Sequence, residues 1–117
     1  MRVLLAVGDP DLRLSLELLL SEEPGVTISG SVIDTGGLLA LARNSCPDLV
    51  LLDWELHGDS IESVLGELQA LDCQPKCIVL GRRHSSQDPA ERAGADVYIT
   101  KGDPPEQLLV AIRALNA

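Results

Sequence analysis

Five short apolar runs alternate along the chain with segments whose leucines recur at helical spacing, and glycine or proline separates most of them. A continuous apolar run is typical of a strand covered on both faces, and leucines three or four positions apart are typical of a helix. The repeated strand and helix order predicts an α/β fold on a parallel sheet. The expected strands are Arg2–Val7, Val26–Val32, Pro47–Asp53, Lys76–Leu80 and Asp96–Thr100.

The helical segments lie between these strands and after the last one. Right-handed crossovers then give a doubly wound sheet of five parallel strands, for which we expect the order 2-1-3-4-5. This order places the ends of strands one, three and five around a common crevice. Between Gly81 and Gly94 the chain allows at most a brief helix, because Pro89 interrupts it. The other helices are expected from Asp9-Pro10 to Pro24-Gly25, from Asp34 or Thr35 to Pro47, from Ser60 to Leu71, and from Pro104-Pro105 onward.

Composition limits the size and the class of this protein. A chain of 117 residues predicts one domain, 1–117. The net charge of −9 opposes direct binding to nucleic acid or to anionic lipid. The first apolar stretch stops at Gly8–Pro10, too short to cross a membrane, so we expect a cytoplasmic protein. The spacing of Cys46, Cys73 and Cys77 supports neither a disulfide framework nor a metal site, and we expect small buried thiols in a reducing cytosol.

Four segments carry a resemblance that covers the whole chain. They are Arg2–Ala6, Pro47–Trp54, Ala93–Asp96 and Tyr98–Lys101. In this order and at these intervals they resemble the receiver domains of two-component response regulators, which are flavodoxin-like (βα)5 modules phosphorylated on an aspartate. The resemblance implies that Asp53 stands at the phosphoacceptor position, Lys101 at the strand-five lysine and Tyr98 at the switch aromatic.

Other functional positions of that family carry different residues here. Val7 and Gly8 stand where receivers have an acidic pair that helps to hold Mg²⁺, and Asp9 comes one position too late. We interpret Asp9 as a helix cap. Gly81 replaces the Ser or Thr that ends strand four and contacts the phosphoryl group, and His57 replaces a proline. The sequence therefore predicts a degenerate, atypical receiver.

These losses lead to two expectations about the site. Only Asp9, Asp53 and Glu55 remain as oxygen donors for a metal, so no metal or other cofactor is expected, and any Mg²⁺ binding should be weak. Without acidic neighbours, Asp53 is free to pair with Lys101. We expect this ion pair to be the resting arrangement and largely structural.

The function that follows is signalling by protein binding, with weak phosphorylation or none. The expected partners are a histidine kinase, an output domain of a transcriptional regulator, or a second copy, through the face formed by the fourth helix, the fifth strand and the last helix. The sequence shows neither a nucleophile accompanied by a general base nor a dinucleotide-binding motif, so we do not expect an enzyme.

Two other functions remain open. Arg82, Arg83 and Lys101 could form a sensor for a small anionic ligand, unless the arginines are solvated and balance nearby acids. A flavin carrier would need a better phosphate loop than Gly8–Asp11.

Overall fold

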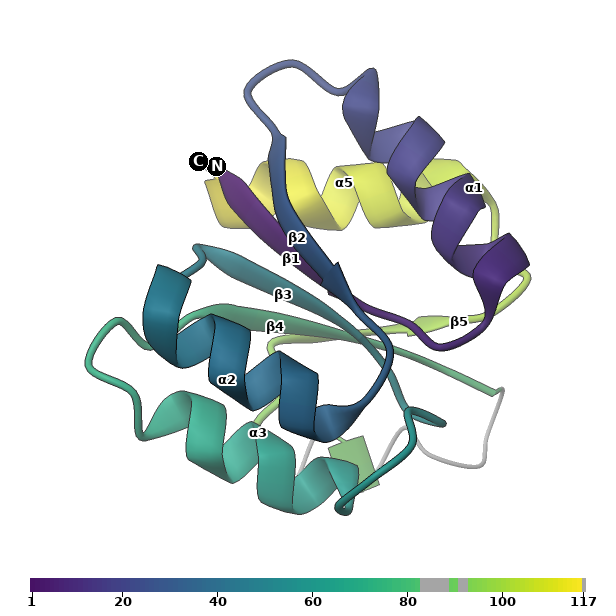
Figure 1. The fold of residues 1–117 in the computed structure, drawn as a ribbon. Coiled ribbons are helices and arrows are strands. Elements are labelled where there is room, and N and C mark those ends of the chain that lie inside the picture. Colours follow the sequence, from purple (N-terminus) through teal and green to yellow (C-terminus); the bar gives the residue numbers. More distant parts are fainter. Residues whose placement is uncertain (83–88, 91–92, 117) are drawn as a thin grey trace.

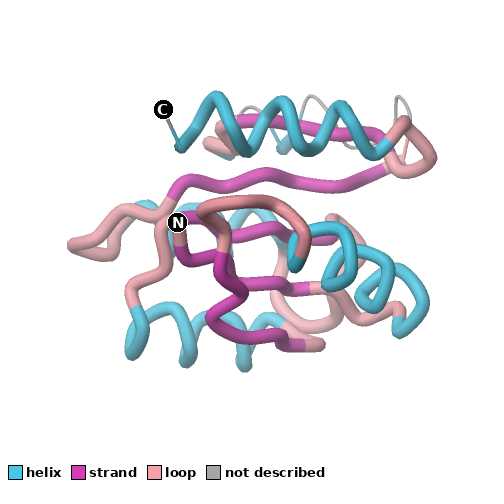
Figure 2. The backbone as a smooth tube through the Cα atoms, turned by 90° about the horizontal axis from the view of Figure 1, so that it is seen from above, coloured by secondary structure: helices cyan, strands magenta, loops and turns pink. Residues whose placement is uncertain are grey.

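Five parallel strands form the centre of the molecule in the computed structural model, which describes residues 1–82, 89–90 and 93–116. The strands lie in the order β2-β1-β3-β4-β5, and they run side by side in Figure 2. This order confirms the predicted doubly wound, flavodoxin-like sheet. The strands are β1 (Arg2–Ala6), β2 (Thr27–Val32), β3 (Leu49–Asp53), β4 (Lys76–Gly81) and β5 (Val97–Thr100).

The helices cover the two faces of this sheet. Figure 1 shows α1 and α5 on one face and α2 and α3 on the other. Their bounds agree with the expected ones to within a few residues. The brief helix expected between Gly81 and Gly94 falls mostly on residues 83–88 and 91–92, outside the described residues. The helices are α1 (Pro10–Ser21), α2 (Thr35–Ser45), α3 (Ile61–Gln69) and α5 (Pro105–Asn116).

Alternation along each strand divides the core into two apolar clusters. On β1, Leu4 faces α2 and α3 whereas Val3 and Leu5 face α1 and α5. Every residue of β3 is buried, as expected for a strand at the middle of a parallel sheet. The apolar run of β3 therefore ends in a carboxylate, that of Asp53, at the sheet edge where the carboxyl ends of the strands meet.

Aspartates begin two of the helices. The Asp9 carboxylate accepts hydrogen bonds from the backbone N–H groups of Asp11 and Leu12, at 2.9 and 3.4 Å. Asp34 accepts one from Gly37 at 2.7 Å, so Asp34 and not Thr35 caps α2. Each cap satisfies N–H groups that have no partner within the helix. The interpretation of Asp9 as a cap is confirmed.

Candidate functional site

Asp53 and Lys101 form an ion pair at the carboxyl edge of the sheet. The Lys101 Nζ lies 2.8 Å from Asp53 Oδ1, and the Asp53 side chain is only 5% exposed. Because β4 lies between β3 and β5, the Lys101 side chain must pass across the end of β4 to reach Asp53. The backbone N–H of Lys101 donates to the Gly81 carbonyl oxygen at 2.8 Å, which positions it for this crossing. The predicted pairing is confirmed.

The two oxygens of Asp53 have different surroundings. Oδ1 also accepts a hydrogen bond from the backbone N–H of Glu55 at 2.9 Å. Oδ2 has no such partner in the described part of the chain, where every buried side-chain oxygen has a hydrogen-bond partner. Oδ2 therefore reaches solvent. One oxygen of Asp53 is therefore held by the protein, and the other makes no hydrogen bond to it.

Glu55 extends the ion pair into a chain of alternating charges. Its carboxylate lies 3.6 Å from Lys101 Nζ and 2.6 Å from Arg82 Nε. The order Asp53, Lys101, Glu55, Arg82 contains two negative and two positive groups. From the sequence, Glu55 was expected only as a possible metal donor, and its pairing with these two cations was not predicted. The available signal was the need to balance two cations, Arg82 and Lys101, beside a single buried aspartate.

Arg82 and Lys101, which were considered as contacts for an anionic ligand, are both paired with carboxylates of the protein. Arg82 is 74% exposed and paired with Glu55, and Lys101 is paired with Asp53 and Glu55. This arrangement agrees with the alternative in which Arg82 is solvated and balances a nearby acid. Arg83 lies outside the described residues.

The positions after β1 supply no carboxylate to this edge. Val7 is fully buried in the cluster under α1 and α5, and Gly8 is exposed. Asp9 is used at the start of α1. The metal candidates Asp9, Asp53 and Glu55 are not brought together: no three His, Cys, Asp or Glu residues within 1–82, 89–90 and 93–116 are grouped to hold an ion.

Tyr98 is held next to the end of β4. Its hydroxyl donates to the backbone carbonyl of Arg82 at 2.6 Å, and its half-buried ring packs against the cluster under α2 and α3. Gly81, where receivers have a hydroxyl, is buried and accepts from Lys101 through its carbonyl. Tyr98 is thus anchored to the backbone directly after Gly81.

Thr35 fixes the loop that follows Asp53, a role that was not predicted from the sequence. The Thr35 side chain is buried, and its hydroxyl accepts a hydrogen bond from the backbone N–H of Asp59 at 2.9 Å. Its own N–H donates to the His57 carbonyl at 2.9 Å. Gly58 has φ +121°, and a Cβ there would collide with the Thr35 hydroxyl. A glycine in a short polar turn was the only signal in the sequence.

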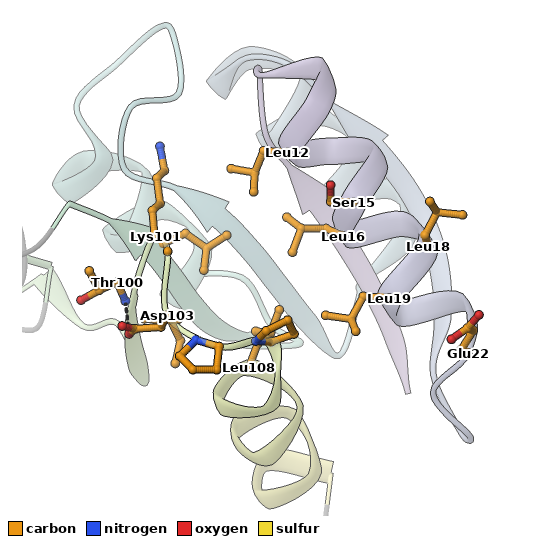
Figure 3. Close-up of a pocket in the computed structure, with 15 residues that line it drawn as sticks. Leu12, Ser15, Leu16, Leu18, Leu19, Glu22, Thr100, Lys101, Asp103 and Leu108 are labelled. Carbon is orange, nitrogen blue, oxygen red and sulfur yellow. Dashed lines mark hydrogen bonds between the residues drawn. The ribbon is translucent and has the colours of Figure 1, made fainter.

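An apolar cavity of about 390 Å³ lies on the other side of Lys101, between α1 and the segment from Ile99 to Pro105 (Figure 3). Leucines of α1, among them Leu12, Leu16 and Leu19, form one wall. Lys101 also lines this cavity, but its amine is paired with Asp53 and Glu55. No unpaired cation among the described lining residues is therefore offered to an anion there. Among the described helices, none is long and apolar enough to cross a membrane.

Comparison with known proteins gives consistent matches over almost the whole chain. The nitrate/nitrite response regulator NarL of Escherichia coli is 30% identical over 117 residues, which is 98% of this chain and 54% of NarL. The transcriptional regulatory protein YxjL of Bacillus subtilis is 33% identical over 116 residues, 97% of this chain and 53% of YxjL. The chain thus spans about half the length of these relatives. No protein-family model matches it.

Solved structures give the same result. A LuxR-family two-component response regulator from Aurantimonas superimposes with a TM-score of 0.87 at 27% identity, covering 97% of this chain and 83% of that one. The response regulator domain of Thermotoga maritima CheB, at 21% identity and a TM-score of 0.88, shares the fold. This chain is a receiver domain of the two-component response regulators. A receiver domain is a signalling module and not an enzyme.

Proposed function

We propose that this domain is an atypical receiver that regulates through contacts with other proteins and accepts a phosphoryl group on Asp53 weakly or not at all. The observation that carries the proposal is the chain of alternating charges from Asp53 to Arg82, whose two negative and two positive groups balance each other. The replacement of the acidic pair by Val7 and Gly8 supports it. Lys101 is the partner of Asp53 in the resting state. We also propose a cytoplasmic location.

The donor set at the sheet edge does not fit Mg²⁺ well. This ion needs octahedral oxygen ligands, usually with one or two carboxylates. Asp53 Oδ1 is committed to Lys101, and the Glu55 carboxylate to Lys101 and Arg82, so a cation would have to displace two paired cations. Val7 contributes a buried apolar side chain and Gly8 none. Both facts support weak metal binding.

Intact-mass measurement after incubation with acetyl phosphate and Mg²⁺ tests this proposal. We expect little or no phosphate adduct on the unmodified domain, in the range seen for Asp53→Asn. A full adduct that is absent from Asp53→Asn would overturn it. Any partial adduct has to disappear in Asp53→Asn, since otherwise it reports another site.

Gly8→Asp is the matched gain-of-function variant. Gly8 is exposed, and a Cβ there meets only the Ile33 carbonyl oxygen at 3.5 Å, an ordinary contact. The variant should therefore fold normally and restore one carboxylate of the pair. We expect its yield of phosphate adduct with Mg²⁺ to exceed that of the parent domain, and an equal yield would show that the missing acid is not the limiting factor.

The relatives suggest where the regulation is exerted. Because NarL and YxjL are about twice as long as this chain, we propose that the domain belongs to a regulator of that kind and controls an output segment. A histidine kinase, an output domain or a second copy would bind the face that includes β5 and α5. Chemical-shift changes confined to β5 and α5 on addition of the partner would support this, and changes on α2 and α3 would oppose it.

A further inference from the structure

Two cysteines lie at the edge of the sheet opposite Asp53. Cys46 ends α2 just before β3, and Cys73 lies in the loop between α3 and β4. These strands are neighbours, and the Lys76 N–H donates to the Asp48 carbonyl at 3.0 Å where they begin. Figure 1 shows the end of α2 and the loop after α3 on the same side of the molecule. The two corners are adjacent in space.

The thiols of these two adjacent corners are both open to reagents. Cys46 and Cys73 are both exposed, so the expectation that the cysteines are buried is wrong for this pair. A side-chain hydrogen bond with Cys46 raises the pKa of Cys73, and burial and the Cys46 charge add to this rise. Cys77 differs from both. It is buried, its thiol donates to the Pro75 carbonyl at 3.7 Å, and burial raises its pKa to about 12.

Both corners are conformationally fixed. Cys46 adopts φ +45° as the C-cap of α2, and its N–H donates to the Ala42 carbonyl at 3.0 Å. Pro47 follows it and is buried. On the other side Gln74 adopts φ +42°, and the buried Pro75 follows. These are the two non-glycine residues with positive φ among those the structure describes. Proline fixes the backbone directly after Cys46 and two positions after Cys73, so little freedom is lost when the sulfurs join.

We propose that Cys46 and Cys73 are an oxidisable dithiol, which a hydroperoxide converts to an intramolecular disulfide. Hydrogen peroxide first oxidises one thiol to a sulfenic acid and is itself reduced to water. The second sulfur then attacks the sulfenic sulfur, the S–S bond forms, and the hydroxyl leaves with the second thiol proton as water. Two thiols and one peroxide give one disulfide and two waters. A dithiol reductant reverses the reaction by exchange.

The disulfide would join the end of α2 to the loop before β4. The loop that it closes contains β3 and α3, and cross-linking such a loop restricts the unfolded chain. The oxidised domain should therefore melt at a higher temperature than the reduced one. Because the bond lies opposite Asp53, it should form equally well in Asp53→Asn, which separates this proposal from the proposed function.

Mass spectrometry of the oxidised domain tests the proposal. The folded protein is treated with hydrogen peroxide, denatured, and alkylated. We expect a loss equal to the mass of two hydrogens, one alkylated thiol (that of Cys77), and reversal by dithiothreitol. Peptide mapping should find Cys46 joined to Cys73. Cys77→Ala should give the same disulfide, whereas Cys46→Ser and Cys73→Ser should each give none.

Four results would overturn the assignment. Three of them are three alkylated thiols after oxidation, a gain of oxygen on both exposed sulfurs without a disulfide, and a covalent dimer as the main product. A disulfide that includes Cys77 would also refute it, since that thiol is buried in the native fold.

Discussion

Replacing Lys101 with Met is the sharpest test of how the candidate site is held together. Methionine keeps most of the aliphatic side chain and removes the ammonium group. It leaves Asp53, only 5% exposed, without the cation that lies 2.8 Å from its Oδ1. Glu55 keeps its contact with Arg82 at 2.6 Å. The loss therefore falls mainly on Asp53.

The expected cost can be bounded from the geometry. A pair at 2.8 Å has a gross attraction of about 6 kcal/mol at an effective dielectric of about 20. Desolvation of the two groups offsets much of this. Leaving a fully buried charge unpaired costs about 3–5 kcal/mol, whereas an exposed pair contributes about 0–1 kcal/mol. Lys101 is 27% exposed and Asp53 Oδ2 reaches solvent, so we expect a loss of about 2 kcal/mol.

Thermal and chemical denaturation of a double-mutant cycle measures this term. For a domain of this size, 2 kcal/mol corresponds to a decrease in Tm of roughly 8 °C. Asp53→Asn removes the unpaired charge, so adding it to Lys101→Met should recover part of the loss. The matched control is Arg43→Met, which breaks an exposed pair with Glu67 at 3.5 Å and should change the free energy of unfolding by less than about 1 kcal/mol.

Two outcomes would refute the reasoning. An unchanged Tm in Lys101→Met would mean that the ion pair contributes nothing to stability. Strict additivity of Lys101→Met and Asp53→Asn would mean that the two side chains do not interact, whatever their distance.

Four further substitutions test other parts of the structure. Thr35→Val should lower the free energy of unfolding by about 1 kcal/mol in urea titration, because the partly buried N–H of Asp59, in the loop after β3, loses its acceptor. The pKa of Cys77 is about 12 in the fold and 9.0 in the unfolded chain, so between these values the thiol stays protonated in the fold and ionises in the unfolded chain. The contribution of Cys77 to the free energy of unfolding is therefore full below pH 9 and falls as pH rises toward 12. Cys77→Ala should flatten the decline of Tm over that range. Gly66→Ala, in open space on α3, should raise stability by about 0.5–1 kcal/mol, whereas Gly94→Ala, at φ +106° and against Gln69, should lower it in the same melting assay.

The fold was predictable because its signals are local. Every residue of β3 before Asp53 is apolar, which is typical of a strand covered on both faces. This pattern predicted that β3 lies in the interior of the sheet. Asp9 followed by Pro10 is a local sequence signal for the start of a helix, and α1 begins there. The observed ends of the helices and strands differ from the predicted ends by a few residues, because these ends depend on caps and on neighbouring segments.

The candidate site was predictable only in part. The pairing of Asp53 with Lys101 followed from topology, since the sheet order brings their strand ends close together. The contacts of Glu55 with Lys101 and Arg82 depend on how two loops pack, and no pattern in the chain encodes that. The same holds for the exposed thiols, whose proximity is set by two corners far apart in sequence.

Charge balance suggests how the state of Asp53 could reach Tyr98 without a hydroxyl at Gly81. A phosphoryl group on Asp53 would bring about two negative charges where one now faces Lys101. In the absence of an added cation, the nearest positive group in the charge chain beyond Lys101 is Arg82, now bound to Glu55. The carbonyl of Arg82 accepts the hydrogen bond of the Tyr98 hydroxyl at 2.6 Å. We infer that any charge change strong enough to draw Arg82 from Glu55 would also disturb the anchor of Tyr98, which makes Arg82 the link between the two positions.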